Sequence, residues 1–300
     1  MLDRPDLLTG KLVAKRTSPL PVAGMITGME AEAAAALLPR LFNLCRVAQS
    51  LAARMAFDLP LVAGQAEAIR QEVLREHLVK FCLKFPGHFG QGAQPLPEGW
   101  QEGADRAREV LFGSTRRLPE TPESFARFVD NRRGVGSVLA RVRDCFSPGE
   151  AAGAPLPSVT PQNALSAAAL ENSVAGRQAH RPIMQQIERE FGRGPFWRAS
   201  ARAYDAQDCM DGLLPKPVSP ERGVAVVPAA RGTYAISARV VDGVVTSFRR
   251  ITPTDHLLAE GGILDQTLAS LPTKKNGMAP LLMDIVDPCM PVQLKEVAHA

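Results

Sequence analysis

The sequence predicts an α+β fold that is rich in helices, with a helical core and a small antiparallel sheet. Apolar residues recur at helical spacing from Gln65 to Phe85, the strongest periodic signal in the chain. Within residues 224–251 β-branched residues cluster instead, and the Asp242-Gly243 step is typical of a tight hairpin turn. Of the 300 residues 45% are hydrophobic and 22% are charged, which is ordinary for a globular protein and excludes a disordered or collagen-like chain.

The N-terminal part is expected to be helical. Residues 30–38 are rich in alanine, and Pro39 is expected to break or kink this helix before a second helical run over residues 40–56. The helix over residues 65–85 follows. Residues 86–100 are rich in Gly and Pro, which predicts an irregular loop.

The middle of the chain alternates short helices with proline-rich connections. Helices are predicted at 101–112, 124–130 and 135–145, then at 164–191, with a break near Gly176 or Pro182, and at 195–208. Residues 147–161 hold four prolines and are predicted to form a flexible linker inside a single domain that spans residues 1–300.

The C-terminal part changes character. Strands are predicted at 224–227, 233–241 and 244–251, and closing helices at 261–271 and 288–297.

Charge and composition narrow the partners. The net charge of +4 is mild for this length and aromatic residues make up 5% of the chain, so neither a nucleic-acid partner nor a stacking platform for bases is expected. No stretch is apolar enough for a secretion signal or a membrane span, since prolines and charges interrupt every candidate. The five cysteines include no CxxC pair, which favours free thiols and a cytoplasmic location.

Two cysteines stand in patterns that allow metal binding. Asp287 suits a helix N-cap and Pro288 the first helical position, so Cys289 is expected in a first turn, where the helix dipole favours a thiolate. The alternative is a small buried residue at the start of a helix. Cys45, on its predicted helical run, is by local pattern alone expected to be a core residue.

Residues 40–53 resemble the RxCGxCxxxHxxAS motif of nickel-iron hydrogenase large subunits. Arg40 and Cys45 keep that pattern, whereas Phe42 stands at its first cysteine and Gln49 at its histidine.

The chain from Asp287 onward is similar to the C-terminal DPCxxCxxH motif of the same subunits. Asp287, Pro288 and Cys289 match, but Val292 replaces the second cysteine and Lys295 the terminal histidine. One cysteine of each pair is therefore retained.

Other segments support the resemblance in the expected order. Two helices of the large subunits resemble residues 70–90 and 197–205. The large subunits also have an Ala-Pro-Arg-Gly motif, then a hairpin, then a Val-Pro-Ser/Thr motif. The same order is found here in residues 230–232, the predicted hairpin and residues 252–254.

This combination resembles the HupK/HoxV group of hydrogenase maturation proteins, which look like shortened large subunits with an incomplete cysteine set. The resemblance implies a non-catalytic scaffold or chaperone on which Cys45 and Cys289 transiently hold iron that carries cyanide and carbon monoxide ligands, without nickel. It also implies that Arg231 and Thr254 meet the cyanide ligands. The implied partners are the hydrogenase large subunit and small accessory chaperones.

For several of these residues, structural roles without metal or cofactor binding remain possible alternatives. Arg231 can be a solvated arginine beside a glycine turn, Thr254 a turn or N-cap residue, and His77 a packed core histidine. Cys82, Cys145 and Cys209 have no motif around them and are expected to be structural. Two other functions compete with the scaffold: a metal-free chaperone of the large subunit and a compact hydrogenase-like redox enzyme.

Overall fold

A computed structural model describes residues 10–17, 20–42 and 44–297. The helices are α1 (Val22–Ile26), α2 (Ala31–Leu41), α3 (Arg46–Ala56), α4 (Gln65–Leu78), α5 (Phe85–His88), α6 (Asp105–Phe112), α7 (Pro122–Asp130), α8 (Val135–Cys145), α9 (Val174–Gln178), α10 (Pro182–Phe191), α11 (Pro195–Asp211), α12 (Pro253–Leu257), α13 (Ile263–Ala269) and α14 (Ala279–Val286). A π-helical segment, Val79–Lys84, joins α4 to α5. The strands are β1 (Lys11–Arg16), β2 (Val224–Ala229), β3 (Gly232–Val241), β4 (Val244–Ile251) and β5 (Val292–Val297).

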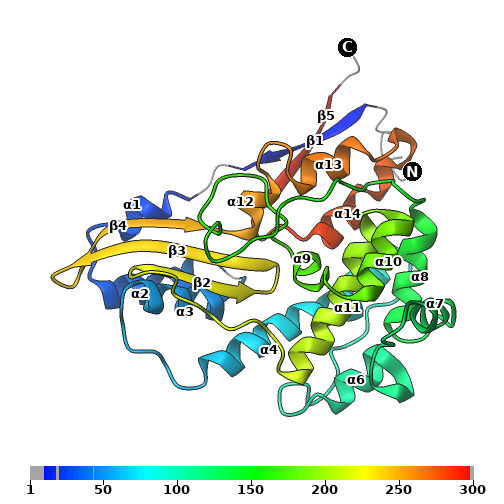
Figure 1. Cartoon of the computed structure of the whole chain (residues 1–300), viewed down its shortest axis with the longest axis horizontal. Helices are drawn as coiled ribbons and strands as arrows, with labels where there is room; N and C mark the ends of the chain where they lie inside the picture. The colour runs from blue at the N-terminus through cyan, green and yellow to red at the C-terminus, as the bar shows by residue number, and fades with distance from the viewer. Residues whose placement is uncertain (1–9, 18–19, 43, 298–300) are drawn as a thin grey trace, which may run out of the picture.

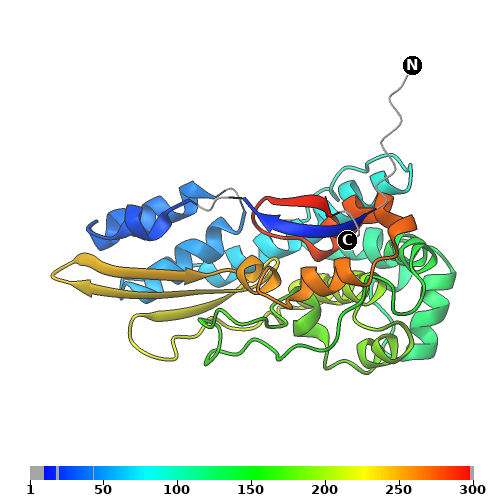
Figure 2. The ribbon, with the colours of Figure 1, turned by 90° about the horizontal axis from the view of Figure 1, so that it is seen from above.

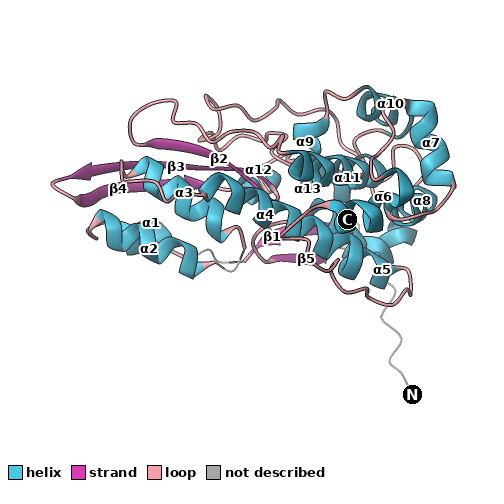
Figure 3. Cartoon of the chain, turned by 90° about the horizontal axis from the view of Figure 1, so that it is seen from below, coloured by secondary structure: helices cyan, strands magenta, loops and turns pink. Residues whose placement is uncertain are grey.

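Most helices gather at one end of the molecule, and the larger sheet extends at the other together with α1, α2 and α3 (Figures 1 and 2). This sheet is antiparallel in the order β2-β3-β4, and Asp242 and Gly243 make the turn between its last two strands. Helix α3 packs on β2 and β3, whereas α2 and α1 contact β4. Helix α4 links the two ends of the molecule, because it contacts α3 and β2 on the sheet side and α11 on the helical side (Figure 3).

Helix α11 is the centre of the helical part. It contacts α4, α8, α9, α10 and α14, and every residue from Pro195 to Met210 is buried. Alanines at 199, 201, 203 and 206 let the neighbouring helices approach closely. Four of its five charged residues, Arg198, Arg202, Asp205 and Asp208, are buried as well, so each needs a partner of opposite charge.

The α+β class with a small antiparallel sheet is confirmed, and the predicted strands and hairpin match β2, β3 and β4 closely. The helix predicted at 135–145 has the observed bounds. Two helical runs form as expected, but the first is not broken at Pro39: α2 continues to Leu41 and α3 begins at Arg46. Pro39 lies two residues before the end of α2, which loses the hydrogen bond of the missing Pro39 N–H without being interrupted.

Two predicted helices are wrong in part or in full. Residues 164–173 contain no helix, and α9 begins only at Val174. The closing helix predicted at 288–297 does not form. Its last residues make β5, which pairs antiparallel with β1, from Lys11 opposite Val297 to Arg16 opposite Val292. A strand partner almost 300 residues away in sequence outweighs the local helix signal.

Residues 147–161 form neither helix nor strand, yet they contact the rest of the fold. The Ala151 N–H donates to the Ser270 carbonyl at 3.2 Å, and Gly153 forms a bridge with Arg193. The flexibility of this segment and the single-domain organisation stay predictions. In the part of the chain that the structure describes, no helix is both long and apolar enough to cross a bilayer.

Gly232 allows a tight connection between β2 and β3. Its φ is +146°, and a Cβ atom there would lie 2.5 Å from Asn172 Oδ1 and 2.7 Å from the Asn172 carbonyl oxygen. Asn172 in turn accepts a hydrogen bond from the Thr233 N–H at 2.6 Å. A side chain at 232 therefore displaces the segment that fixes this turn.

We expect Gly232→Ala to lower the free energy of unfolding by more than about 2 kcal/mol, from backbone strain and the clash with Asn172. Gly243→Ala is the matched control, since its φ of +78° is also positive but nothing lies within 4 Å of its Cβ position. Urea unfolding of both variants measures the difference. Equal destabilisation would show that the contact with Asn172 is irrelevant.

Candidate metal-binding site

Cys45 and Cys289 line the same cavity, although 243 residues separate them in the sequence. Its volume is about 30 Å³, room for about two water molecules. The remaining lining residues are Phe42, Leu44, Gln49, Ala229, Arg231, Tyr234, Arg250, Thr252, Pro253 and Met290. The cavity therefore lies where the α2–α3 connection, the β2–β3 turn, the start of α12 and the segment after α14 meet.

Cys45 is the residue immediately before α3. The expectation that it lies within a helix is therefore wrong. Its φ of 55° and ψ of 41° are left-handed, so the chain turns sharply there. The Glu72 carboxylate accepts hydrogen bonds from the N–H groups of Val47 (2.7 Å) and Ala48 (3.2 Å) and thereby caps α3. Burial raises the pKa of the Cys45 thiol to about 12, although the Arg231 charge acts in the opposite direction. Without a metal, Cys45 is a neutral thiol at pH 7.

The expected helical environment of Cys289 is wrong. Asp287 ends α14 with a left-handed backbone (φ 57°, ψ 60°) and does not cap a new helix. Cys289 instead contacts Thr254 in α12 twice. The Thr254 hydroxyl donates to the Cys289 sulfur at 2.9 Å and accepts from the Cys289 N–H at 2.6 Å. A hydroxyl donor, and not a helix dipole, faces this sulfur.

Thr254 is fully buried, so its side chain is committed to Cys289. The N-cap of α12 is Thr252, which forms a capping box with Asp255. The N-cap alternative for Thr254 is therefore wrong.

Arg231 lies in the β2–β3 turn and is buried, which excludes the solvated alternative. Its Nη1 is 4.0 Å from the Cys45 sulfur, its Nη2 is 3.0 Å from Glu76 Oε2, and its Nε is 3.1 Å from Asp287 Oδ1. Burial opposes the charge on Arg231, but Asp287 and the other nearby anionic groups outweigh it and hold its pKa above the usual value. The cavity thus contains a fixed positive charge beside Cys45.

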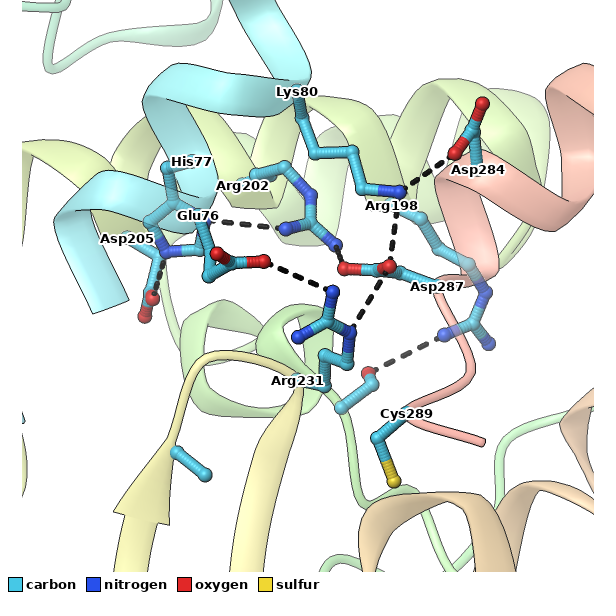
Figure 4. Close-up of polar contacts among 12 residues, drawn as sticks. Glu76, His77, Lys80, Arg198, Arg202, Asp205, Arg231, Asp284, Asp287 and Cys289 are labelled. Carbon is cyan, nitrogen blue, oxygen red and sulfur yellow. Dashed lines mark hydrogen bonds and ion pairs between the residues drawn. The ribbon is translucent and has the colours of Figure 1, made fainter. Parts of the chain in front are cut away.

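Asp287 joins the elements around the site (Figure 4). Besides Arg231, it pairs with Arg202 of α11 at 3.0 Å and with Lys80 of the π-helical segment at 2.9 Å. Burial opposes its ionisation, yet the three cations lower the pKa of Asp287 to about 2. Lys80 also pairs with Asp284 of α14 at 2.8 Å.

His77 and Asp205 form a neighbouring buried pair. The Asp205 carboxylate lies 2.7 Å from His77 Nε2, and Arg202 Nη1 lies 3.2 Å from His77 Nδ1. Because Arg202 can only donate, Nδ1 accepts and Nε2 carries the proton, so the imidazole is neutral. Burial lowers the pKa of His77, in agreement with this assignment.

The pair lies within 4.8 Å of the Cys209 sulfur, a spacing that would suit a metal ion. However, Arg177 occupies both oxygens of Asp205, at 3.0 and 2.7 Å, and Arg202 occupies the free nitrogen of His77. Two guanidinium groups and a full set of hydrogen bonds make this cluster structural. His77 is therefore a packed core histidine, as the structural alternative predicts.

The structure brings the four predicted site residues together: Cys45, Cys289 and Arg231 line the cavity, and Thr254 contacts Cys289. Sequence reasoning missed Glu76, Lys80 and Arg202, and it treated Asp287 only as a cap. A signal was available for the first two, since Glu76 and Lys80 continue the apolar stripe of Ile69 and Val73 at helical spacing. Charged residues within such a stripe indicate buried ion pairs.

The chain is similar to known hydrogenase expression/formation proteins. The hydrogenase expression/formation protein HupK of Rhodobacter capsulatus is 48% identical over 282 residues, which cover 94% of this chain and 92% of that protein. The hydrogenase expression/formation protein HupV of Azotobacter chroococcum mcd 1 is 26% identical, with 92% and 91% covered. No protein-family model matches the chain.

Among solved structures, the as-isolated oxidised Ni-Fe-Se hydrogenase from D. vulgaris Hildenborough superimposes with a TM-score of 0.58 at 12% identity. The match covers 94% of this chain and 96% of the hydrogenase chain. The helical core with a small antiparallel sheet is thus the fold of hydrogenase large subunits, and the likeness includes most of residues 91–194, for which sequence motifs gave no correspondence.

We expect Asp287→Asn to lower the free energy of unfolding by about 3–5 kcal/mol, because it leaves three buried cations without their shared anion. Asp284→Asn is the control: Asp284 is also paired with Lys80, but 27% of its side chain is exposed, so the loss there is expected to stay below about 1 kcal/mol. Urea unfolding at pH 7 measures both. A small effect at Asp287 would contradict its structural role.

His77 predicts a pH dependence of stability. Its folded-state pKa is lowered from 6.5, so below that pH the unfolded chain binds a proton that the folded chain does not. The stability that neutral His77 provides is present above pH 6.5 and is lost as the pH falls, with a slope of at most about 1.4 kcal/mol per pH unit. Unfolding between pH 7.5 and 5.5 measures the slope, which His77→Gln should reduce. The same substitution at the exposed His180 is the control, and an unchanged slope in His77→Gln would refute the assignment.

Proposed function

The chain belongs to the HupK family of hydrogenase expression/formation proteins, and within that role we propose that it is a non-catalytic scaffold for part of the metal centre. Its cargo is the iron-dicyano-carbonyl group, which Cys45 and Cys289 hold transiently before delivery to the hydrogenase large subunit. The observation that carries this proposal is the shared cavity of two distant cysteines, with the Arg231 guanidinium 4.0 Å from one of the sulfurs.

The donor set supports a single iron and not a nickel-iron pair. Two thiolates suit a soft iron centre whose other positions are already filled by diatomic ligands. Phe42, which stands at one missing cysteine, contributes to the cavity a phenyl ring that cannot coordinate. Val292, at the other, begins β5 and pairs with Arg16. The fold therefore offers no third or fourth thiolate at these two places.

Arg231 and Thr254 provide the surroundings that such a group needs. Arg231 is always charged, and Glu76 and Asp287 hold it in one orientation, so it can donate to an anionic cyanide nitrogen beside Cys45. The Thr254 hydroxyl donates to the Cys289 sulfur, which stabilises negative charge on it.

The high pKa of Cys45 suits temporary binding. Iron binds the thiolate, so loading must release the proton that the Cys45 thiol keeps at neutral pH. Part of the binding free energy is spent on this deprotonation, which weakens the hold on the cargo. Two thiolates with this cost release iron more readily than the four of a complete centre.

We further propose that the scaffold acts in the cytoplasm, in contact with the large subunit and with small accessory chaperones of the hydrogenase system. A carrier that hands over its cargo needs both a donor and an acceptor, and the chain shares the fold of hydrogenase large subunits, the proposed acceptor.

Infrared spectroscopy tests the proposal. We expect protein purified from cells that make the maturation machinery to show cyanide and carbonyl stretching bands, and either Cys45→Ser or Cys289→Ser to abolish them. Cys145→Ser is the matched control, because Cys145 is also half-buried but lies outside the cavity.

Unchanged bands in both cysteine variants would refute the shared site. If the bands were absent from the wild type and hydrogenase still matured in cells that carry both substitutions, the protein would be a metal-free chaperone. Hydrogen oxidation or stoichiometric nickel in the purified chain would instead show an enzyme.

A further inference from the structure

A second and larger pocket adjoins the cysteine cavity. This outer pocket, of about 270 Å³, is lined among others by Arg16, Ala23, Arg249, Arg250, Asp255 and Met290. Arg250 and Met290 also line the cysteine cavity. The same two side chains therefore form a wall between the two spaces.

Phe42 packs against this wall from the side of the cysteine cavity. The Arg250 guanidinium carbon lies 4.1 Å from the centroid of the Phe42 ring, a close cation–π contact. Arg250 projects from β4, Phe42 follows α2, and Met290 follows Cys289, so only side chains from three separate segments meet here. Side-chain rotation can open such a partition without moving a helix or strand.

The two spaces differ in size. The cysteine cavity of about 30 Å³, whose two cysteines are half-buried, has room for about two waters, whereas an iron atom with three diatomic ligands is larger. The outer pocket, at about 270 Å³, is large enough to receive the whole group.

The charges of the outer pocket favour an anion. Asp255 pairs with Arg16 at 2.7 Å and also accepts hydrogen bonds from Thr252, so these two charges balance. Among the described residues, neither Arg249 nor Arg250 has a carboxylate within ion-pair distance. Two arginines without a carboxylate partner therefore line the outer pocket at this point.

We propose that the outer pocket is the entrance to the cysteine cavity, that it selects small anionic metal–cyanide groups, and that the Phe42–Arg250 pair with Met290 is the partition that opens for them. The identity of the cargo rests on the proposed function. The entrance itself is a property of the metal-free protein and can be tested without iron.

Alkylation of the full-length, metal-free protein is the test. Neutral iodoacetamide and anionic iodoacetate are compared, and mass spectrometry follows the modification of each cysteine. We expect Phe42→Ala to speed the reaction of Cys45 and Cys289 with iodoacetamide several-fold, because the partition is removed. Phe42→Leu, which keeps an apolar side chain but loses the ring, should give a smaller increase.

Plugging the pocket should have the opposite effect. Ala23 is exposed and lines the outer pocket, so Ala23→Trp is expected to slow the modification of both cavity cysteines. Ala36→Trp is the matched control, since Ala36 is exposed on α2 and lines neither space.

A pair of arginine variants separates the effect of the pocket's charge on the reaction rate from the effect of the partition. Arg249→Gln should lower the ratio of the iodoacetate rate to the iodoacetamide rate by about twofold, the Coulomb effect of one charge at about 8 Å in water, and leave the iodoacetamide rate unchanged. Arg250→Gln should lower the same ratio and also raise the iodoacetamide rate, because it touches Phe42. Arg222→Gln, at an exposed arginine outside the pocket, should change neither.

Cys145 serves as an internal reference, since a variant that merely loosens the fold will speed its modification as well. The proposal is overturned if Ala23→Trp does not slow the cavity cysteines, or if Phe42→Ala speeds them only in step with Cys145. If these rates behave as expected but the iron infrared bands are absent, the entrance stands and the proposed cargo is wrong.

Discussion

The charge on Asp287 holds the site together. A buried carboxylate is costly unless cations and hydrogen bonds replace the lost water, and here Arg231, Arg202 and Lys80 all lie within about 3 Å of it. These cations come from the β2–β3 turn, from α11 and from the π-helical segment after α4. One carboxylate thereby fixes the relative positions of elements whose contact with one another no local sequence pattern predicts.

This arrangement places each cysteine indirectly. Asp287 is two residues before Cys289, so the ion pairs anchor the segment on which Cys289 lies. Arg231, held by the same carboxylate and by Glu76, in turn lies beside Cys45. Glu72, on the same helix as Glu76, caps α3 immediately after Cys45. The two cysteines therefore line one cavity because of α4 and Asp287, although they form no disulfide with each other.

The same geometry favours the proposed carrier over a finished metal centre. The fold is that of hydrogenase large subunits, but the cavity contains the ring of Phe42 where the related motif has a cysteine. Cys45 is a neutral thiol and Cys289 receives a hydroxyl hydrogen bond, so the two potential ligands differ chemically. A small, partly closed cavity next to a positively charged pocket is suited to a group that arrives and leaves.

The sequence by itself determined the features that depend on interactions between residues close together in the chain. The hairpin between β3 and β4, the helices around residues 65–85 and 135–145, and the absence of paired cysteines follow from local periodicity, turn chemistry and spacing. Motif resemblance added the family and the four predicted site residues, because short motifs remain recognisable where the similarity to hydrogenase large subunits is low overall.

Only the tertiary structure decided the surroundings of those residues. Asp-Pro-Cys has the local signature of a helix start, yet β5 pairs with β1 at the other end of the chain, and Asp287 turns inward to three cations. The burial of Arg231, the neutral state of Cys45 and the wall formed by Phe42 and Arg250 likewise depend on segments far apart in sequence. Long-range strand pairing and buried ion pairs involve partners that no local pattern specifies, so only the folded chain reveals them.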